Sequence, residues 1–282
     1  MIMWKYIKHE RSKAMKKRVI SLFTVLLLAL SLFGTTVFAD AYRLEASTDT
    51  AVCIEDTDWK GSGKIVFYPK TLESNDETYP VVVWANGTGC VTSLYYDLLR
   101  SFASAGYIVV ADTTVMSADG KDQISAIDYI AEKSAQPDSI LYGRVNMEKI
   151  CAAGHSQGGR SAVNAAAADS RISCVLSIAG SSFKNEAKGV TCPAFFMTGT
   201  ADLMVLSSVW VKPAYEAVQG SAVYASLKGG IHTTCIINHE KISGYAIAWL
   251  DANLKGSDEA AAVFAPNGVL ANDKAWKSFA CK

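Results

Sequence analysis

Short apolar runs, continuous rather than alternating, recur along the sequence after its first 60 residues. Seven of them have the length of a strand and are rich in β-branched and aromatic residues: residues 64–69, 79–87, 107–114, 149–156, 174–180, 193–199 and 222–229. A strand that is apolar on both faces is typical of a parallel sheet covered by helices on both sides. The pattern therefore predicts a buried, mostly parallel sheet.

Helical patterns alternate with these runs. They are expected at residues 94–105, 122–135, 157–168, 211–218 and 239–253, with Asp122 and Asn238 as candidate N-caps. From Lys255 onward the pattern weakens into a short Ala-rich helix and a tail that ends at Cys281. Repetition of strand, helix and strand predicts an α/β fold with a doubly wound, mostly parallel sheet of about eight strands.

The first 39 residues have the layout of a secretory signal peptide. Seven basic residues precede an apolar run, Val19–Phe33, and a small-residue site follows at Val37–Ala39. A retained membrane anchor is the alternative, but the run is shorter than the roughly 20 residues that a bilayer span needs. We expect cleavage near Ala39, no stable membrane span afterwards, and a secreted protein whose single catalytic domain comprises residues 40–282.

Removal of this leader changes the net charge. It contains seven of the 27 basic and one of the 27 acidic residues, which leaves 20 basic and 26 acidic residues and a net charge of about −6. No cluster of Lys and Arg remains to neutralise phosphates, so nucleic acid is excluded as a partner.

All seven cysteines lie after the leader, where an oxidising exterior would permit disulfides. Because seven is odd, a monomer keeps at least one thiol. Cys151 and Cys174 lie in or beside apolar runs and are expected to be buried small hydrophobes, while the pairing of the others stays open. The spacing contains no CxxC pair and no Cys/His cluster, so no metal site is predicted.

The hexapeptide from Gly154 to Gly159, GHSQGG, stands directly after a predicted strand and directly before a predicted helix. In this context the GxSxG pattern predicts a strained strand-to-helix turn that exposes the hydroxyl of Ser156 above the sheet. A glycine-rich turn with an incidental serine is the plainer reading. The context favours Ser156 as a nucleophile.

A serine nucleophile needs a histidine base and a carboxylate that orients it. Of the histidines after the leader, His155 should point away from the serine and pack locally, and His239 opens a helix. His232 follows the last predicted strand in a loop with two glycines, which favours it as the base. Asp202 follows another strand and completes the chain order Ser, Asp, His of α/β-hydrolases, although an Asx turn is the other common use of such an aspartate.

Acyl transfer also needs donors for the oxyanion. The main-chain N–H of Gln157, directly after the nucleophile, is one candidate. The loop Asn86–Gly89 follows an early strand, and its glycines allow the amides to turn inward, so the N–H of Thr88 is the other candidate. An ordinary turn is the alternative for this loop.

The motifs PVVVWANGTGC, GHSQGG, FFMTGTADLMV and GGIHTT together resemble the α/β-hydrolase superfamily over roughly residues 79–254. The resemblance is strongest to its secreted, lidless branch of dienelactone-hydrolase-like, chlorophyllase-like and polyester-hydrolase (cutinase-type) enzymes. It implies an α/β-hydrolase fold without a large lid and carboxylic ester hydrolysis by Ser156, Asp202 and His232, with no cofactor and no metal.

Near the expected acyl pocket the sequence departs from the polyester-hydrolase pattern. Thr88 and Gln157 stand where an aromatic residue and a methionine are common, and Ser181 replaces the aromatic expected after the sixth strand, with Phe183 nearby. Gly87, Ser181 and Phe183 are expected to contact substrate. These departures favour a smaller or more polar ester, in free form or borne on a polymer, over a flat aromatic polymer.

Three alternatives to a secreted serine esterase stay open. An acyltransferase of the same fold would pass the acyl group to an alcohol instead of water. A catalytically silent fold could serve as an extracellular binding module, which the intact Ser156, Asp202 and His232 argue against. A peptidase of this fold would usually have an accessory domain, and we expect none in these 282 residues.

Overall fold

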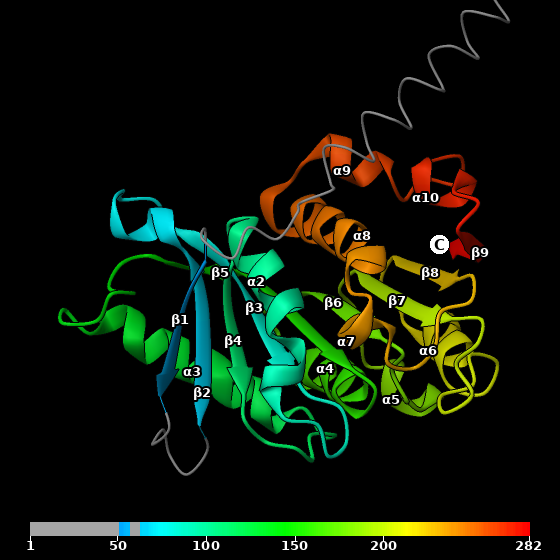
Figure 1. Cartoon of the computed structure of the whole chain (residues 1–282), viewed down its shortest axis with the longest axis horizontal. Coiled ribbons are helices and arrows are strands. Elements are labelled where there is room, and N and C mark those ends of the chain that lie inside the picture. The colour runs from blue at the N-terminus through cyan, green and yellow to red at the C-terminus, as the bar shows by residue number, and fades with distance from the viewer. Residues whose placement is uncertain (1–50, 57–62) are drawn as a thin grey trace, which may run out of the picture. The chain divides into compact units, whose positions relative to one another are not determined.

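A computed structural model describes residues 51–56 and 63–282, and in this part of the chain one nine-stranded sheet runs through the centre (Figure 1). Its strands are β1 (Ala51–Asp56), β2 (Lys64–Pro69), β3 (Tyr79–Ala85), β4 (Ile108–Asp112), β5 (Val145–His155), β6 (Ile172–Ile178), β7 (Ala194–Gly199), β8 (Ala222–Leu227) and β9 (Trp276–Cys281). Their order in space is β1-β2-β4-β3-β5-β6-β7-β8-β9. The six strands from β4 to β8 pair in parallel, whereas β1, β2 and β9 join antiparallel at the two edges.

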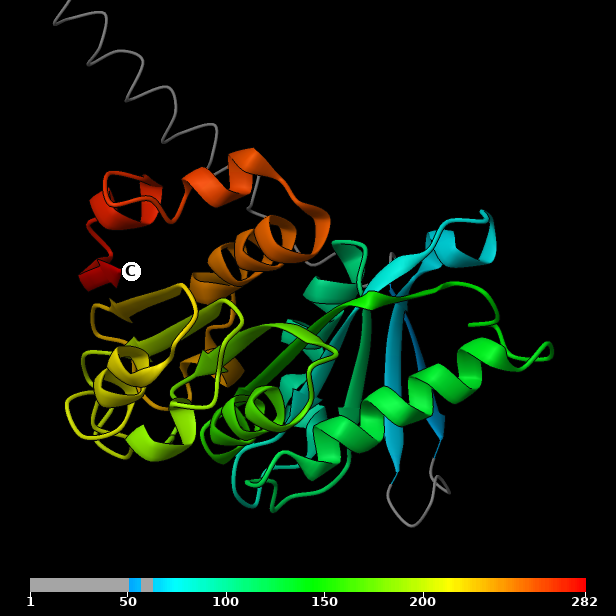
Figure 2. The same cartoon turned by 180° about the vertical axis from the view of Figure 1, so that it is seen from behind.

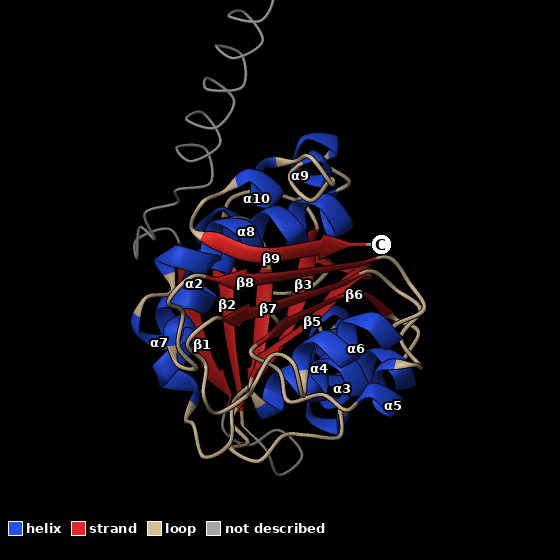
Figure 3. Cartoon of the chain, turned by 90° about the vertical axis from the view of Figure 1, so that its right-hand side faces the viewer, coloured by secondary structure: helices blue, strands red, loops and turns tan. Residues whose placement is uncertain are grey.

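Helices cover both faces of the sheet. They are α2 (Tyr96–Ser104), α3 (Lys121–Ala135), α4 (Gln157–Ala168), α5 (Lys184–Ala187), α6 (Val211–Ala217), α7 (Thr234–Ile237), α8 (Glu240–Leu250), α9 (Asp258–Ala262) and α10 (Val269–Asn272), with 3-10 turns η3 (Lys70–Glu73) and η4 (Thr92–Tyr95) and a π-helical turn η5 (Asp251–Lys255). Figure 3 shows α3, α4, α5 and α6 on one face and α2, α8, α9 and α10 on the other. Figure 2 shows the first of these layers from behind, with the long green helix α3 in front of the strands.

Five strands of the sheet are buried from end to end. Every residue of β2, β3, β4, β7 and β8 is buried, which is the condition that continuous apolar runs indicate. The doubly wound α/β architecture is therefore confirmed. The connection from β6 to β7 contains only the four-residue helix α5, in agreement with the expected absence of a large lid at this point of the chain.

The structure differs from the sequence prediction at the sheet edges and at two helix ends. Its nine strands agree with the expected number of about eight, but only seven of them correspond to the apolar runs of the sequence, because β1 and the C-terminal β9 were not predicted. Neither predicted N-cap caps a helix. The N-cap of α3 is Gly120 with φ 87°, and Asp122 lies inside the helix, where it accepts a hydrogen bond from Ser117. The N-cap of α8 is His239, without a side-chain capping bond.

The N-cap position of α3, residue 120, requires glycine. Its φ of 87° is unfavourable for residues with a side chain, and an added Cβ would lie 2.5 Å from the main-chain nitrogen of Ala165 in α4. The two helices therefore touch through main chain at this point. Asp122 has the residue type of an N-cap, but the close contact between Gly120 and α4 places the N-cap at Gly120 instead.

The two cysteines predicted to be buried are fully buried thiols that face each other on neighbouring strands, Cys151 on β5 and Cys174 on β6. That prediction is confirmed. Cys90, Cys192, Cys235 and Cys281 are also thiols in this structure.

A buried ion pair joins β2 to β4. The ammonium group of Lys64 donates to Asp112 Oδ2 at 2.6 Å, and the two side chains are 0% and 1% exposed. The second carboxylate oxygen of Asp112 accepts the N–H of Thr114 at 2.7 Å. Good geometry and additional hydrogen bonds are what a buried pair needs to offset its desolvation.

The predicted leader and its cleavage point near Ala39 lie outside the described residues. Among the residues that the structure does describe, no helix combines the length and the apolar character needed to cross a bilayer.

Candidate active site

Ser156 occupies the turn between β5 and α4, as the motif predicted. Its φ of 56° and ψ of −119° place it in a region that residues other than glycine seldom adopt. Two main-chain hydrogen bonds hold this conformation: the N–H of Ser156 donates to the carbonyl of Ile178 at 2.9 Å, and its own carbonyl accepts the N–H of Ser181 at 3.2 Å. The turn is thus anchored to the end of β6.

The glycines on either side are required by close packing. An added Cβ on Gly154 would lie 2.3 Å from the carbonyl oxygen of Gly158, and one on Gly158 would lie 2.0 Å from that of Ala85. Strand β5, helix α4 and the end of β3 therefore meet without room for a methyl group. This is the physical reason for glycine at both flanking positions of the motif.

The structure brings Ser156, His232 and Asp202 together at the C-terminal edge of the parallel strands. His232 Nε2 lies 2.9 Å from Ser156 Oγ, and His232 Nδ1 lies 2.8 Å from Asp202 Oδ2. His232 is in the loop after β8 and Asp202 is in the loop after β7. Both distances are within the range of a hydrogen bond between a nucleophile, its base and the carboxylate that orients the base.

Asp202 combines the two roles that its sequence context allowed. Its Oδ1 accepts the main-chain N–H groups of Met204 at 3.0 Å and Val205 at 2.9 Å, which forms an Asx-type turn, while its Oδ2 faces His232. Burial alone raises the pKa of the Asp202 carboxyl, but the hydrogen bonds from His232 and from the two amides outweigh it, so its pKa is lowered. Asp202 is therefore ionised and can accept a proton-bearing Nδ1.

Neither of the two other histidines after the leader takes part in the hydrogen bonds between Ser156, His232 and Asp202. His239 stands at the start of α8, 3.9 Å from a carboxylate oxygen of Glu240. His155 is 2% exposed, and both of its ring nitrogens have partners: Nδ1 lies 2.9 Å from the hydroxyl of Tyr95, and Nε2 lies 2.9 Å from the main-chain oxygen of His232. No pattern in the sequence predicts the contact between His155 and Tyr95.

The burial of His155 predicts a loss of stability in acid. Desolvation, followed by the neighbouring His232, lowers its pKa from the ordinary 6.5 to about 4. Between these values the unfolded chain binds a proton that the folded protein does not, so protonation favours unfolding. The contribution of neutral His155 to the free energy of unfolding is complete above pH 6.5. It is lost as the pH falls to 4, by about 3 kcal/mol in total.

Urea unfolding followed by tryptophan fluorescence at pH 6.5, 5.5 and 4.5 measures this slope. We expect the variant His155→Gln, which has no ionisable group at this position, to lose clearly less stability over the same interval. Parallel slopes for the two proteins would show that His155 is not the group responsible.

The candidate oxyanion loop lies beside the nucleophile. An added Cβ on Gly87 would be 3.4 Å from Cβ of Ser156, so Gly87 touches the turn, and Thr88 is the next residue. Asn86 holds the loop in place, because its side-chain amide donates to Thr92 Oγ1 at 3.0 Å and to the main-chain carbonyl of Asp112 at 2.9 Å. Gln157 is the first residue of α4, where main-chain N–H groups have no partner within the helix.

Ser181 and Phe183, the other predicted substrate contacts, follow β6. Ser181 is tied to Ser156 through the main-chain bond described above. Phe183 is 44% exposed and packs edge-on against Trp210, with ring centroids 5.0 Å apart. The guanidinium of Arg160 lies 4.4 Å from the centroid of the Phe183 ring and also pairs with Glu186. These contacts fix the position of Phe183, and sequence alone did not predict Trp210 or Arg160 as its neighbours.

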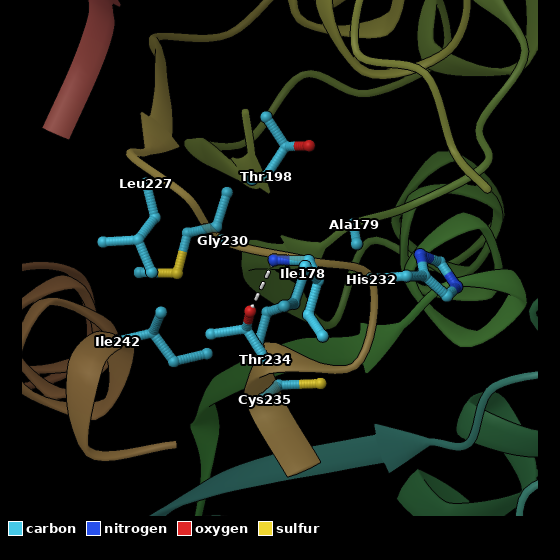
Figure 4. Close-up of a pocket in the computed structure, with 12 residues that line it drawn as sticks. Ile178, Ala179, Thr198, Leu227, Gly230, His232, Thr234, Cys235 and Ile242 are labelled. Atoms are coloured by element: carbon cyan, nitrogen blue, oxygen red, sulfur yellow. Dashed lines mark hydrogen bonds between the residues drawn. The ribbon is translucent and has the colours of Figure 1, made fainter. Parts of the chain in front are cut away.

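A small cavity of about 20 Å³, the size of one water molecule, lies behind His232 (Figure 4). Its walls are mostly apolar and include Ile178, Leu227 and Ile242. Figure 4 shows the imidazole of His232 at the side of this group, and the bond from the N–H of Ile231 to Thr234 Oγ1, 2.8 Å long, that stiffens the loop. The cavity is too small for a substrate. The residues that line it pack against the loop that carries His232 and support it.

In the described part of the chain, no three His, Cys, Asp or Glu side chains gather closely enough to hold a metal ion. The polar groups at the candidate site are those of an acyl-transfer centre: a hydroxyl, an imidazole, a carboxylate and main-chain amides.

Two comparisons relate the chain to known ester hydrolases. A bis(hydroxyethyl) terephthalate hydrolase from Streptomyces coelicolor is 24% identical over 195 residues, which cover 67% of this chain and 61% of that protein. The chain thus matches about three-fifths of the length of this relative. The model of the PET hydrolase-like family matches residues 35–275. Both names describe ester hydrolases, and the extent of the family match shows that the chain belongs to the PET hydrolase-like family of α/β-hydrolases.

Proposed function

We propose that this protein is an exported serine hydrolase that cleaves carboxylic esters through Ser156, His232 and Asp202. The observation that supports the proposal best is the unbroken hydrogen-bonded series from Ser156 Oγ through the imidazole to Asp202 Oδ2, with distances of 2.9 and 2.8 Å. Family membership supports an ester as the substrate class. Export is inferred from the leader at residues 1–39.

The proposed reaction has two steps. His232 Nε2 takes the proton of Ser156 Oγ as this oxygen bonds to the ester carbonyl carbon, and the alcohol leaves with that proton, which gives an acyl-enzyme. A water molecule then gives a proton to the same nitrogen and attacks the acyl carbon. The acid is released and Ser156 Oγ recovers its proton. Asp202 stabilises the imidazolium in both steps.

Negative charge develops on the carbonyl oxygen in each tetrahedral intermediate. We assign its stabilisation to the main-chain N–H groups of Gln157 and Thr88. Gln157 offers the free N-terminus of α4, and Thr88 stands beside Gly87, which touches Ser156.

The surface around the triad supports an uncharged substrate. Eleven large apolar side chains are exposed in the segments that follow β3, β4, β6, β7 and β8: Val91, Leu94, Val115, Met116, Phe183, Leu203, Met204, Leu206, Val209, Ile231 and Ile237. These segments leave the same edge of the sheet as Ser156. The segments after β7 and β8 contain few charges: residues 199–211 carry one charged side chain, Asp202, and residues 229–238 contain no Asp, Glu, Lys or Arg. A largely uncharged, apolar surface on these two segments favours uncharged esters.

Close to the nucleophile the surface is more polar, with Thr88, Gln157 and Ser181. We therefore propose a compact ester that carries polar groups, rather than a long stack of aromatic rings. The relative's name supports this size class, since bis(hydroxyethyl) terephthalate is a small ester with hydroxyl ends. We infer that the protein accepts esters of that kind.

Labelling and turnover of the secreted protein test the proposal. A fluorophosphonate probe is expected to modify it once, on the peptide that contains Ser156, and p-nitrophenyl esters are expected to give a burst followed by steady turnover. We expect short acyl chains and bis(hydroxyethyl) terephthalate to be cleaved faster than long acyl chains or a polyester film. A protein that stays unlabelled would favour a binding module, and ester products formed in added alcohol at the expense of free acid would favour an acyltransferase.

A further inference from the structure

Three groups outside the triad form a continuous hydrogen-bonded series that ends on the main-chain oxygen of His232. The N–H of Gly87 donates to the Tyr95 hydroxyl at 3.1 Å, this hydroxyl lies 2.9 Å from His155 Nδ1, and His155 Nε2 lies 2.9 Å from the main-chain oxygen of His232. We call this series the Tyr95–His155 bridge. It connects the oxyanion loop to the backbone of the histidine base.

Each group in the bridge has only one possible role. A main-chain oxygen can only accept, so Nε2 of His155 carries the hydrogen and donates it to His232. In a neutral imidazole Nδ1 then has no hydrogen, so it accepts from the Tyr95 hydroxyl. The oxygen of this hydroxyl is left to accept the N–H of Gly87. The direction of every bond is therefore fixed.

The protonation states needed for this arrangement are maintained by burial. Desolvation lowers the pKa of His155 to about 4, so its imidazole is neutral at ordinary pH. Desolvation, together with the neighbouring Cys90 thiol, raises the pKa of the Tyr95 hydroxyl, which keeps its proton.

The bridge is also tightly packed. Tyr95 and His155 are 1% and 2% exposed, and the rings of Trp84, Tyr95, His155 and His232 follow one another with centroids 5.1, 5.7 and 4.7 Å apart. An added Cβ on Gly87 would lie 3.0 Å from both the Tyr95 hydroxyl and His155 Nδ1. Movement of the bridge would therefore move the oxyanion loop and the histidine loop together.

We propose that Tyr95 and His155 are positioning residues that hold the oxyanion loop and His232 in register with Ser156. This inference rests on the proposed function, because it concerns the geometry of the same acyl transfer. Neither residue touches substrate. Their contribution is to keep two loops, which follow β3 and β8, at a fixed separation. A displacement of 1 Å in such a site can lower the rate about 100-fold.

The variant Tyr95→Phe removes one hydroxyl and leaves the ring packing in place. We expect kcat to fall about tenfold to fiftyfold with KM within threefold of its original value, since a misplaced loop weakens interactions formed in the transition state. The affinity for a trifluoromethyl ketone, which forms a tetrahedral oxyanion on Ser156, should fall by the same factor as kcat/KM. The affinity for a non-reacting substrate analogue should stay the same.

The matched control is Tyr245→Phe. Its hydroxyl also donates to a side chain, that of the half-buried Asp273, at 2.6 Å, but it lies outside the bridge and the triad. We expect this variant to lower the melting temperature and to leave kcat within twofold. If Tyr95→Phe behaves like this control, losing stability but neither rate nor inhibitor affinity, the proposal is wrong.

If Tyr95→Phe does not fold, two variants of His155 provide the same comparison. The amide of His155→Gln can still donate to the oxygen of His232, whereas His155→Leu cannot. We expect the glutamine variant to keep at least fivefold more activity than the leucine variant at equal folded fraction. Equal activities would overturn the proposal. A wild-type protein that neither labels nor turns over would refute the proposed function instead, before the bridge is tested.

Discussion

The variant Ser156→Ala is expected to lower kcat for p-nitrophenyl esters on the order of a million-fold, since no other group in the described site can form the acyl-enzyme. The remaining rate should exceed that of the reaction in water, because the oxyanion donors and the binding surface are intact. Steady-state kinetics together with the amplitude of the initial burst measures both expectations.

Ser161→Ala is the matched control for this variant. Ser161 lies in α4, the helix that follows Ser156; it is 0% exposed, and its hydroxyl makes no hydrogen bond with any described residue. Its removal should change neither kcat nor the labelling by a fluorophosphonate. A Ser156→Ala protein that keeps a thousandth of the activity or more would mean that another group acts as nucleophile.

The variant Asp202→Asn is expected to lower kcat about 10⁴-fold, although it changes only one atom. The position of Oδ1 receives two N–H donors, from Met204 and Val205, so the amide oxygen of an asparagine must occupy it. The amide nitrogen then faces His232 Nδ1 and donates to it. This forces the hydrogen of the imidazole onto Nε2, where it can no longer take the proton of Ser156.

Asp273→Asn is the matched control, because Asp273, like Asp202, accepts a main-chain N–H with one carboxylate oxygen and faces a side chain with the other. Asp273 accepts the N–H of Ala275 with one oxygen and the Tyr245 hydroxyl with the other, far from the nucleophile in the fold. This variant should keep its kcat. The melting temperature of Asp202→Asn should stay close to that of the parent, and a loss of activity that parallels loss of folded protein would contradict the tautomer argument.

The buried strands and the turn that bears Ser156 could be predicted from the sequence, because both leave short-range patterns. A strand buried on two faces is apolar at every position, and the turn that bears Ser156 needs glycines two residues away on both sides. The predicted helix at residues 157–168 coincides with α4. The chain order of Ser156, Asp202 and His232 then restricted the choice of partners, since each follows a different strand and the ends of parallel strands meet at one edge.

The features that were not predicted depend on contacts between distant segments. The strand β9 has one buried residue, Trp276, and forms only because it pairs with β8 at an edge, and its sequence was interpreted as a tail. The N-cap of α3 is set by the approach of α4. The contact between Tyr95 and His155 spans 60 residues and joins side chains with no motif in common. No local pattern encodes such a contact.

The ion pair between Lys64 and Asp112 fixes the register of β2 against β4, which the apolar side chains of β2 alone would leave undetermined. Because all six residues of this strand are buried, sliding it by one residue along β4 would exchange one set of apolar side chains for another at small energetic cost. The same slip would carry the ammonium group to the opposite face and leave the carboxylate without its counter-ion inside the protein. The observed alignment, with Lys64 opposite Asp112, is the one that avoids this. A costly charged contact can thus select a unique pairing that an all-apolar strand could not specify.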